Sequence, residues 1–211
     1  MKKFELTNEF VTNMFGTKLF RIRALVEFGD VEAGELGGYV EKESNLGHDD
    51  NAWVYDNAWV YGNARVYGDA LVYDNARVYD NAWVYGDAQV SGDARVSGNA
   101  RVYDNAWVYG NAQVSGDARV CGDARVCGNG DYAYAHGFGS VNRTTTFFRL
   151  KDGGVGVRCG CFYGTLAQFR DKIRETHGET KKAQEYLMLA DLMELRFEED
   201  ENEVGNRKYV E

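Results

Sequence analysis

NAWVYDNAWVYGNARVYGDALVYD, residues 51–74, repeats nearly the same six residues four times, and the pattern continues to about residue 129. Each unit reads Ala, any residue, Val, then Tyr, Ser or Cys, then Gly or Asp, and finally Asn or Asp. The first four positions alternate as in a short strand with Ala and Val on one face, and the last two are residue types that turn the chain at low cost. The stretch predicts a coil of short strands and tight turns.

Aliphatic residues six apart, each preceded two positions earlier by a small residue, resemble the hexapeptide repeat of left-handed parallel β-helices, a superfamily that includes acyltransferases. The resemblance implies three units per triangular coil, so that residues eighteen apart stack at about 4.8 Å. Thirteen units then give a little over four coils. The expected inward ladders are Val54, Val72, Val90, Val108 and Val126; Val60, Val78, Val96 and Val114; and Val66, Val84, Val102 and Val120.

The segments on either side of the repeat are predicted to cap it, because the ends of such a coil expose unpaired strand edges. Residues 1–48 hold two alternating strands around a turn at residues 13–16 and are expected to form an N-terminal β cap. Residues 49–130 are the β-helix, whose first coil should be irregular because Leu46 does not keep the phase of Val54. Residues 131–211 are a C-terminal α+β module, so the fold class is mainly β.

Within the module, residues 136–150 and 153–164 are predicted as strands joined at residues 151–154. Thr165 is positioned to cap a helix that ends at Gly178, and a second helix runs from about residue 180 to residue 197. The second helix is apolar on more than one face, which is typical of a helix between two surfaces, and the second surface could belong to another protomer. The charged tail, residues 197–211, is predicted to be partly mobile.

The whole chain resembles a group of hexapeptide-repeat proteins common in phages and prophages of gut-type bacteria. The resemblance rests on LFRIRAL (19–25) and GELGGYVE (34–41), then on TTTFFR (144–149), CGCFYGTLAQFRDKI (159–173), THG (176–178) and YLMLADLMELRF (186–197). It implies this fold, with a variable number of repeat units, and a phage setting, but it brings no catalytic residues. An acyltransferase assignment from the repeat alone is an analogy between folds.

Composition restricts the location and the partners. A net charge of -9 disfavours sequence-independent binding to nucleic acid. The N-terminus, MKKFELTNEF, lacks the apolar core of a signal peptide, and no later run is long enough to span a membrane. Four cysteines are too few for a secreted disulfide framework. We expect a cytoplasmic protein, in the host cytosol if phage-encoded, with free thiols.

Catalysis and metal binding are both disfavoured. An acyltransferase needs a histidine base, and His48, His136 and His177 all lie outside the hexads. Cys159 and Cys161 with His177 could offer metal ligands, but alternation along a strand places both cysteines on one side as small buried groups, and no fourth ligand is evident. No catalytic residue, cofactor or metal is predicted.

The candidate ligand-binding residues are polar side chains of the module set among aromatic ones, because arginine forks match phosphate and aromatic rings can stack on a base. They are His136, Arg143, Thr144, Arg149, Arg158 and His177. A secondary candidate surface on the coil is Trp83, Arg101 and Tyr103. Two simpler interpretations remain open: the aromatic ladders only stabilise stacked strands, and the arginines only cover an aromatic core.

The function that these features favour is a non-catalytic binding protein, a homotrimer that holds a small anionic, nucleotide-like ligand. In a phage setting, this would be a counter-defence protein that sequesters a nucleotide signal. One alternative is a protein-interaction scaffold whose Trp and Tyr ladders engage a host protein, and a second is an acyltransferase of the hexapeptide-repeat class. Neither a membrane nor sequence-specific nucleic acid is expected as a partner.

Overall fold

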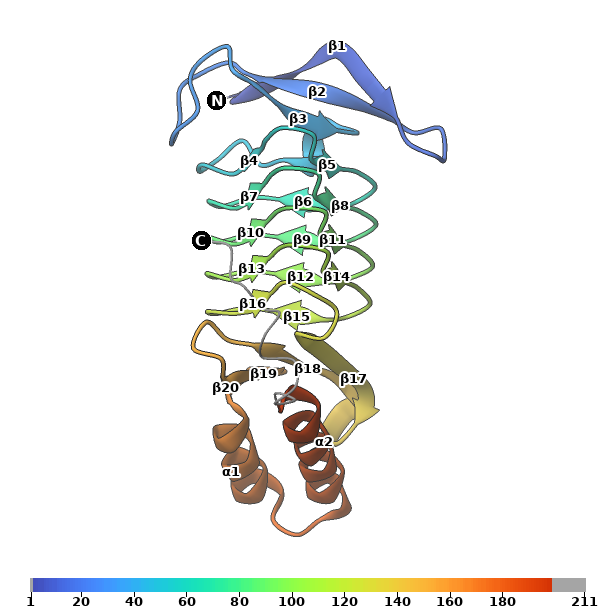
Figure 1. Ribbon diagram of the computed structural model, residues 1–211, viewed down its shortest axis with the longest axis vertical. Helices are drawn as coiled ribbons and strands as arrows, with labels where there is room; N and C mark the ends of the chain where they lie inside the picture. Colours follow the sequence, from blue (N-terminus) through green and yellow to red (C-terminus); the bar gives the residue numbers. More distant parts are fainter. Residues whose placement is uncertain (1, 199–211) are drawn as a thin grey trace.

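The computed structural model describes residues 2–198, and it shows a column of stacked coils between a β cap and a module of strands and two helices (Figure 1). Thirteen strands of two residues each build the column. They are β4 Trp53–Val54, β5 Trp59–Val60, β6 Arg65–Val66, β7 Leu71–Val72, β8 Arg77–Val78, β9 Trp83–Val84, β10 Gln89–Val90, β11 Arg95–Val96, β12 Arg101–Val102, β13 Trp107–Val108, β14 Gln113–Val114, β15 Arg119–Val120 and β16 Arg125–Val126.

The strands pair in parallel with every third strand, which is the eighteen-residue stacking that the sequence predicts. The three faces of the column have the orders β4-β7-β10-β13-β16, β5-β8-β11-β14 and β6-β9-β12-β15. Val90, for example, lies between Val72 and Val108. All thirteen ladder valines are fully buried, so the predicted ladders are confirmed. The left-handed sense of the coil stays a prediction.

The fifth position of each unit but the last forms the corner with a positive φ. It is aspartate in some units, as at Asp56 with φ 50°, and glycine in others, as at Gly98 with φ 66°. Aspartate and glycine are among the residues that enter this left-handed region at the lowest cost. At Gly98 the stacking is also close, because a Cβ atom would lie 2.9 Å from the backbone nitrogen of Gly116. The repeated Gly/Asp pattern is therefore a requirement of the backbone.

The N-terminal cap continues one face of the column. Strand β2 (Lys18–Ala24) pairs antiparallel with β1 (Phe4–Thr12) and with β3 (Leu36–Val40), and β3 pairs in parallel with β5. A 3-10 turn, Glu43–Asn45, leads into the first coil. Leu46 bridges to Val66, twenty residues on rather than eighteen, so the first coil is irregular as predicted.

One outward position of the coil is not at the surface. Trp53 belongs to the outward row of its face by sequence, yet it is fully buried. Phe4 and Phe28 of the cap pack edge-on against its ring, with centroids 6.2 and 5.2 Å away. The cap therefore covers the start of this face, which removes Trp53 from any ladder available to a partner.

The C-terminal module is a four-stranded antiparallel sheet followed by a helix pair. Its elements are β17 (Tyr132–Phe138), a 3-10 turn (Ser140–Asn142), β18 (Arg143–Arg149), β19 (Val155–Cys159), β20 (Phe162–Thr165), α1 (Leu166–His177) and α2 (Lys181–Phe197). Thr165 and Gln168 form a reciprocal cap at the start of α1, and Gly178 ends it, as predicted. The charged tail beyond Glu198 lies outside the described residues.

Two strand predictions in the module are wrong. Residues 136–150 are not one strand, because the chain reverses at residues 139–142 between β17 and β18. Residues 153–164 also contain a reversal, at Gly160 with φ 61°. Cys159 is buried, but this turn leaves Cys161 exposed, so the prediction that both cysteines are buried on one side fails for Cys161.

Strand β18 and the segment after it close the lower end of the column. The hydroxyl oxygen of Thr146 accepts a hydrogen bond from the backbone nitrogen of Arg119 at 2.9 Å. The backbone nitrogen of Lys151 donates to the carbonyl oxygen of Asp123 at 3.0 Å. These bonds attach the module directly below the last coil (Figure 1). No helix within residues 2–198 is long and apolar enough to cross a membrane.

Candidate functional site

A groove of about 680 Å³ lies where the module meets the β6-β9-β12-β15 face of the column. We call it the coil–module groove. The column lines it with Asn81, Trp83, Asn99, Arg101, Asp117 and Arg119, and the module lines it with His136, Val141, Arg143, Thr144 and Gly160. A volume of this size lies within the usual range for small-molecule sites.

The repeat itself produces the column side of the groove. Trp83, Arg101 and Arg119 occupy the same position in successive coils, and the strand register places them directly beside one another. Asn81, Asn99 and Asp117 precede them by two residues and form a second row at the corner. The eighteen-residue period thus turns distant parts of the sequence into two parallel rows of polar groups.

The groove carries an excess of positive charge. It contains three arginines, Arg101, Arg119 and Arg143, against one carboxylate, Asp117. Within residues 2–198, no carboxylate lies within ion-pair distance of any of these three guanidinium groups. The Nε atom of Arg143 is buried and has no hydrogen-bond partner in this part of the chain. The site therefore holds uncompensated cations in a chain whose net charge is -9.

A glycine makes room for the arginine of the module. A Cβ atom on Gly160 would fall 1.9 Å from a terminal guanidinium nitrogen of Arg143. The guanidinium group therefore lies against the backbone at the β19–β20 turn. Gly160 serves two purposes at once, since the turn needs its positive φ and the arginine needs the absence of its side chain.

The rim of the groove includes a backbone outlier. Val141 has φ 52° and ψ 27°, a left-handed conformation that is rare for a β-branched residue and costs roughly 1–3 kcal/mol. Its side chain is largely exposed. The loop is fastened to α2, since the backbone nitrogen of Gly139 donates to Glu185 at 2.9 Å and that of Ser140 donates to the Tyr186 hydroxyl at 3.1 Å. Strain of this kind is often retained at binding sites.

A ladder of side-chain amides runs along the column to the groove. Asn63 donates to Asn81, Asn81 to Asn99, and Asn99 to Asp117, at distances of 3.2, 3.2 and 3.0 Å. Lys42 of the cap donates to Asn63 at 3.3 Å and begins the series. The ladder orders the corner row, and it directs the single carboxylate of the groove toward Asn99.

The groove brings together five of the nine residues that the sequence singles out. His136 and Thr144, whose Nδ1 and Oγ1 atoms lie 2.9 Å apart, line it with Arg143. Trp83 and Arg101 of the secondary surface line the same groove. The two candidate groups were separate in the sequence and are adjacent in the fold. The sequence reasoning did not assign Asn81, Asn99, Asp117, Arg119, Val141 and Gly160 to the site.

The other four candidates do not line the groove. Arg158 lies over the Tyr103 ring, 5.9 Å from its centroid, and Tyr103 is buried. Arg149 lies over Phe197, and His177 packs against Tyr186 with ring centroids 5.9 Å apart. All four have structural neighbours that account for their positions.

Tyr103 also stabilises the column. It stacks on Tyr85 with centroids 5.0 Å apart and ring planes 2° from parallel. Burial raises the pKa of the Tyr103 hydroxyl well above its usual range, and a hydrogen bond with Cys121 raises it further. Burial likewise raises the pKa of the Cys121 thiol. Tyr103 and Cys121 are thus neutral, packed groups at physiological pH.

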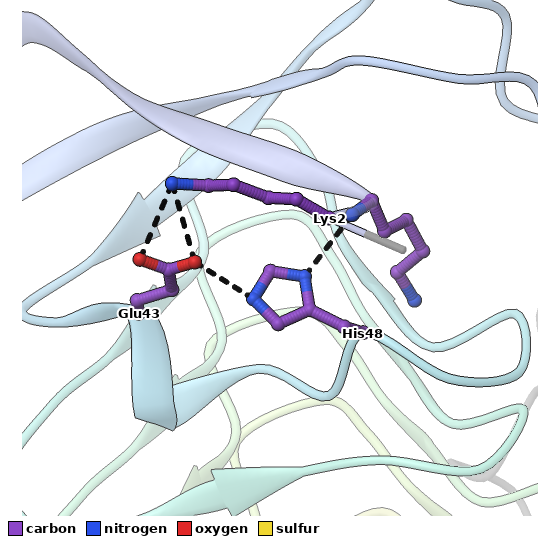
Figure 2. Close-up of polar contacts among 4 residues, drawn as sticks. Lys2, Glu43 and His48 are labelled. Atoms are coloured by element: carbon purple, nitrogen blue, oxygen red, sulfur yellow. Dashed lines mark hydrogen bonds and ion pairs between the residues drawn. The ribbon is translucent and has the colours of Figure 1, made fainter.

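A histidine–carboxylate pair occurs in the N-terminal cap and has the geometry of a structural contact (Figure 2). The Nε2 atom of His48 lies 2.9 Å from Glu43, and its Nδ1 atom accepts the backbone N–H of Lys3 at 3.2 Å. Lys2 contacts the same carboxylate at 3.3 Å, and its hydrogen bond is the main reason that the pKa of Glu43 is lowered. Both ring nitrogens of His48 are occupied, so the ring cannot serve as a base for a bound substrate.

The cysteines do not assemble a metal site. All four are free thiols, and within residues 2–198 no three or more His, Cys, Asp or Glu side chains form a group that could hold a metal ion. The Cys159 thiol instead accepts a hydrogen bond from Thr145 at 3.2 Å.

Part of the column is similar to a known repeat family. A family model described as the YdcK β-solenoid repeat matches six segments, several of which overlap: residues 58–72, 70–86, 88–101, 94–110, 100–116 and 112–128. All of them lie in the column, so the similarity concerns the β-solenoid and not the module. No curated protein matches the chain.

Proposed function

We propose that the protein binds a small anionic ligand in the coil–module groove and does not transform it. The observation that carries this proposal is the convergence of Arg101, Arg119 and Arg143 on one hollow with no carboxylate partner among the described residues. Guanidinium groups left unpaired in a partly enclosed site are suited to a phosphate or carboxylate, because charge-assisted hydrogen bonds are strong there.

The arginine row alone would not support the proposal. Arg77 and Arg95 are also neighbours on adjacent strands of another face, but neither of them lines the groove. What distinguishes the groove is the module, which adds Arg143, His136 and Thr144 to its lining. The resemblance to phage proteins extends the proposal to the capture of a nucleotide signal of host defence.

Calorimetric titration with a panel of nucleotides and inorganic anions tests the proposal. Arg119→Ala and Arg143→Ala should each weaken binding by about tenfold or more through loss of a charge-assisted pair. Arg95→Ala is the matched control, because Arg95 is exposed at the same repeat position on the β11 strand. Equal binding by all three variants would place the ligand elsewhere, and no binding by the unchanged protein would exclude ligand capture.

A scaffold for a protein partner is the second candidate, and a specific observation favours it. Met14 and Phe15 at the tip of the β1–β2 hairpin are 88% and 80% exposed. Met188, Leu192 and Leu195 form an exposed apolar stripe on α2. Exposed apolar groups of this kind suit a protein interface. Retention of a host protein by the purified chain, abolished by Phe15→Ser but not by Arg143→Ala, would favour the scaffold.

A further inference from the structure

Two arginines of its own column lie over the Trp83 ring. Arg101 on the next strand lies 4.8 Å from the ring centroid, and Arg65 on the preceding strand lies 5.9 Å from it. Tyr67 adds an edge-on contact at 6.1 Å. A base that stacked on Trp83 would have to compete with these cation–π contacts for the ring. Trp83 is thus placed to support Arg101, and it does not present a bare ring to a ligand.

The arginines of the groove come from two adjacent strands of the column and from the module. Arg101 and Arg119 are register partners on adjacent parallel strands, so their backbones are about 4.8 Å apart and they form a row. Arg143 lines the same groove from β18 of the module, with its guanidinium group against Gly160. The cations therefore extend from the row on the column to the module, which lies below the last coil (Figure 1).

A row of arginine side chains on neighbouring strands is unfavourable without a ligand, because the like charges repel one another. Like charges directly opposite on neighbouring strands destabilise a sheet, and the one carboxylate of the groove already accepts a hydrogen bond from Asn99. A single phosphate can contact one or two of the guanidinium groups. A ligand with several linked anionic groups can contact all three and relieve the repulsion along the whole row.

We propose that the ligand of the groove carries two or more linked phosphate groups, and that the arginine row recognises these phosphates without stacking of a base on Trp83. This inference rests on the proposed function. Arginine forks bind the oxygens of phosphate and of carboxylate in a bidentate manner. Phosphate is favoured because several phosphates can be linked in a short chain that follows a row of arginines. Trp83 is a positioning residue for Arg101.

The test is calorimetric titration of the full chain with inorganic phosphate, pyrophosphate, tripolyphosphate, AMP, ADP and ATP, in buffer without divalent cations. Pyrophosphate and ADP should bind at least about tenfold more tightly than phosphate and AMP, and tripolyphosphate should bind nearly as well as ATP. Binding should weaken with added salt. If AMP binds as tightly as ATP while tripolyphosphate does not bind, the inference is wrong and the proposed function stands. If none of the six compounds binds, the proposed function fails as well.

Variants separate the phosphate row from base stacking. Arg101→Ala should weaken the binding of ATP and of tripolyphosphate by a similar factor of about tenfold, and Arg95→Ala should change the binding of neither ligand. Trp83→Leu should weaken both ligands equally and by less than Arg101→Ala, because it only loosens Arg101. Loss of ATP binding with tripolyphosphate binding intact in Trp83→Leu would overturn the inference. Urea unfolding of each variant verifies the fold. In Arg101→Lys, which retains the charge, the binding of ATP and of tripolyphosphate is compared in the same way.

Discussion

Val90→Asp should strongly destabilise the column at neutral pH, whereas Gln89→Asp on the same strand should be tolerated. Val90 is fully buried between Val72 and Val108. An aspartate there would be neutral when folded, because burial raises a carboxyl pKa by up to 3–5 units. In the unfolded chain the same carboxyl ionises with a pKa of about 3.9. At pH 7 this difference destabilises the fold by about 4 kcal/mol.

Two further losses add to that figure. Burying even a neutral carboxylic acid without a partner costs about 1–3 kcal/mol, and the transfer energy of the valine side chain is lost. The total approaches the whole stability of a typical domain, about 5–15 kcal/mol. The Gln89 side chain faces outward, and among residues 2–198 it accepts one hydrogen bond, from the Tyr73 hydroxyl at 3.2 Å, so its replacement should cost about 1 kcal/mol.

Urea unfolding followed by tryptophan fluorescence at pH 6 and pH 7 measures both variants. A carboxyl whose folded pKa is raised contributes stability below its unfolded pKa and loses it as the pH rises. The deficit of Val90→Asp should therefore grow by about 1.4 kcal/mol between pH 6 and pH 7. A deficit that does not change with pH, or equal damage by Gln89→Asp, would refute the assignment of Val90 to a dry core.

Three more predictions follow from the site, the cap and the assembly. Gly160→Ala should reproduce most of the affinity loss of Arg143→Ala, because the new methyl group would displace the guanidinium; unchanged affinity in a titration would contradict this. Burial lowers the pKa of Lys3 to about 8 although nearby aspartates raise it, so the unfolded chain binds this proton more tightly. Between pH 8 and about pH 10.5 the free energy of unfolding of the wild type should therefore rise by on the order of 3 kcal/mol relative to that of Lys3→Met, as measured by urea unfolding. The same pH dependence in both proteins would refute the lowered pKa of Lys3. We also propose a trimer, as in the resembled superfamily, and light scattering at micromolar concentration should give three times the chain mass, where a monomer would exclude it.

The column could be predicted from the sequence because the same residue pattern recurs in every unit. Each unit has a valine for the core and a glycine or aspartate for the corner, and the eighteen-residue stacking follows from three units per coil. The irregular first coil was also predictable, since Leu46 breaks the phase of the repeat. The burial of Trp53 could not be predicted from the repeat, because it depends on Phe4 and Phe28, which come from a cap outside the repeat.

The groove could be predicted only in part. Sequence pointed to Arg143 and to Arg101 separately, from charge and aromatic neighbours. Their meeting depends on how the module docks, which is fixed by unrepeated contacts such as that of Thr146 with the backbone of Arg119. Residues such as Asn99 and Asp117 occupy the same position as equivalent residues in other coils, so the repeat does not single them out. They line the groove only because the module lies beside their coils.

The eighteen-residue period also makes the column a spacer of adjustable length. The groove uses only the coils that carry Trp83, Arg101 and Arg119, whereas the N-terminal cap joins the column several units earlier. Removing or adding eighteen residues between cap and groove preserves every stacking partner and changes the length by one step of about 4.8 Å. The hairpin tip at Met14 and Phe15 can thus be moved relative to the coil–module groove in fixed increments, while the groove keeps its geometry. The distance that a partner must span to contact both ends would therefore depend on the number of coils.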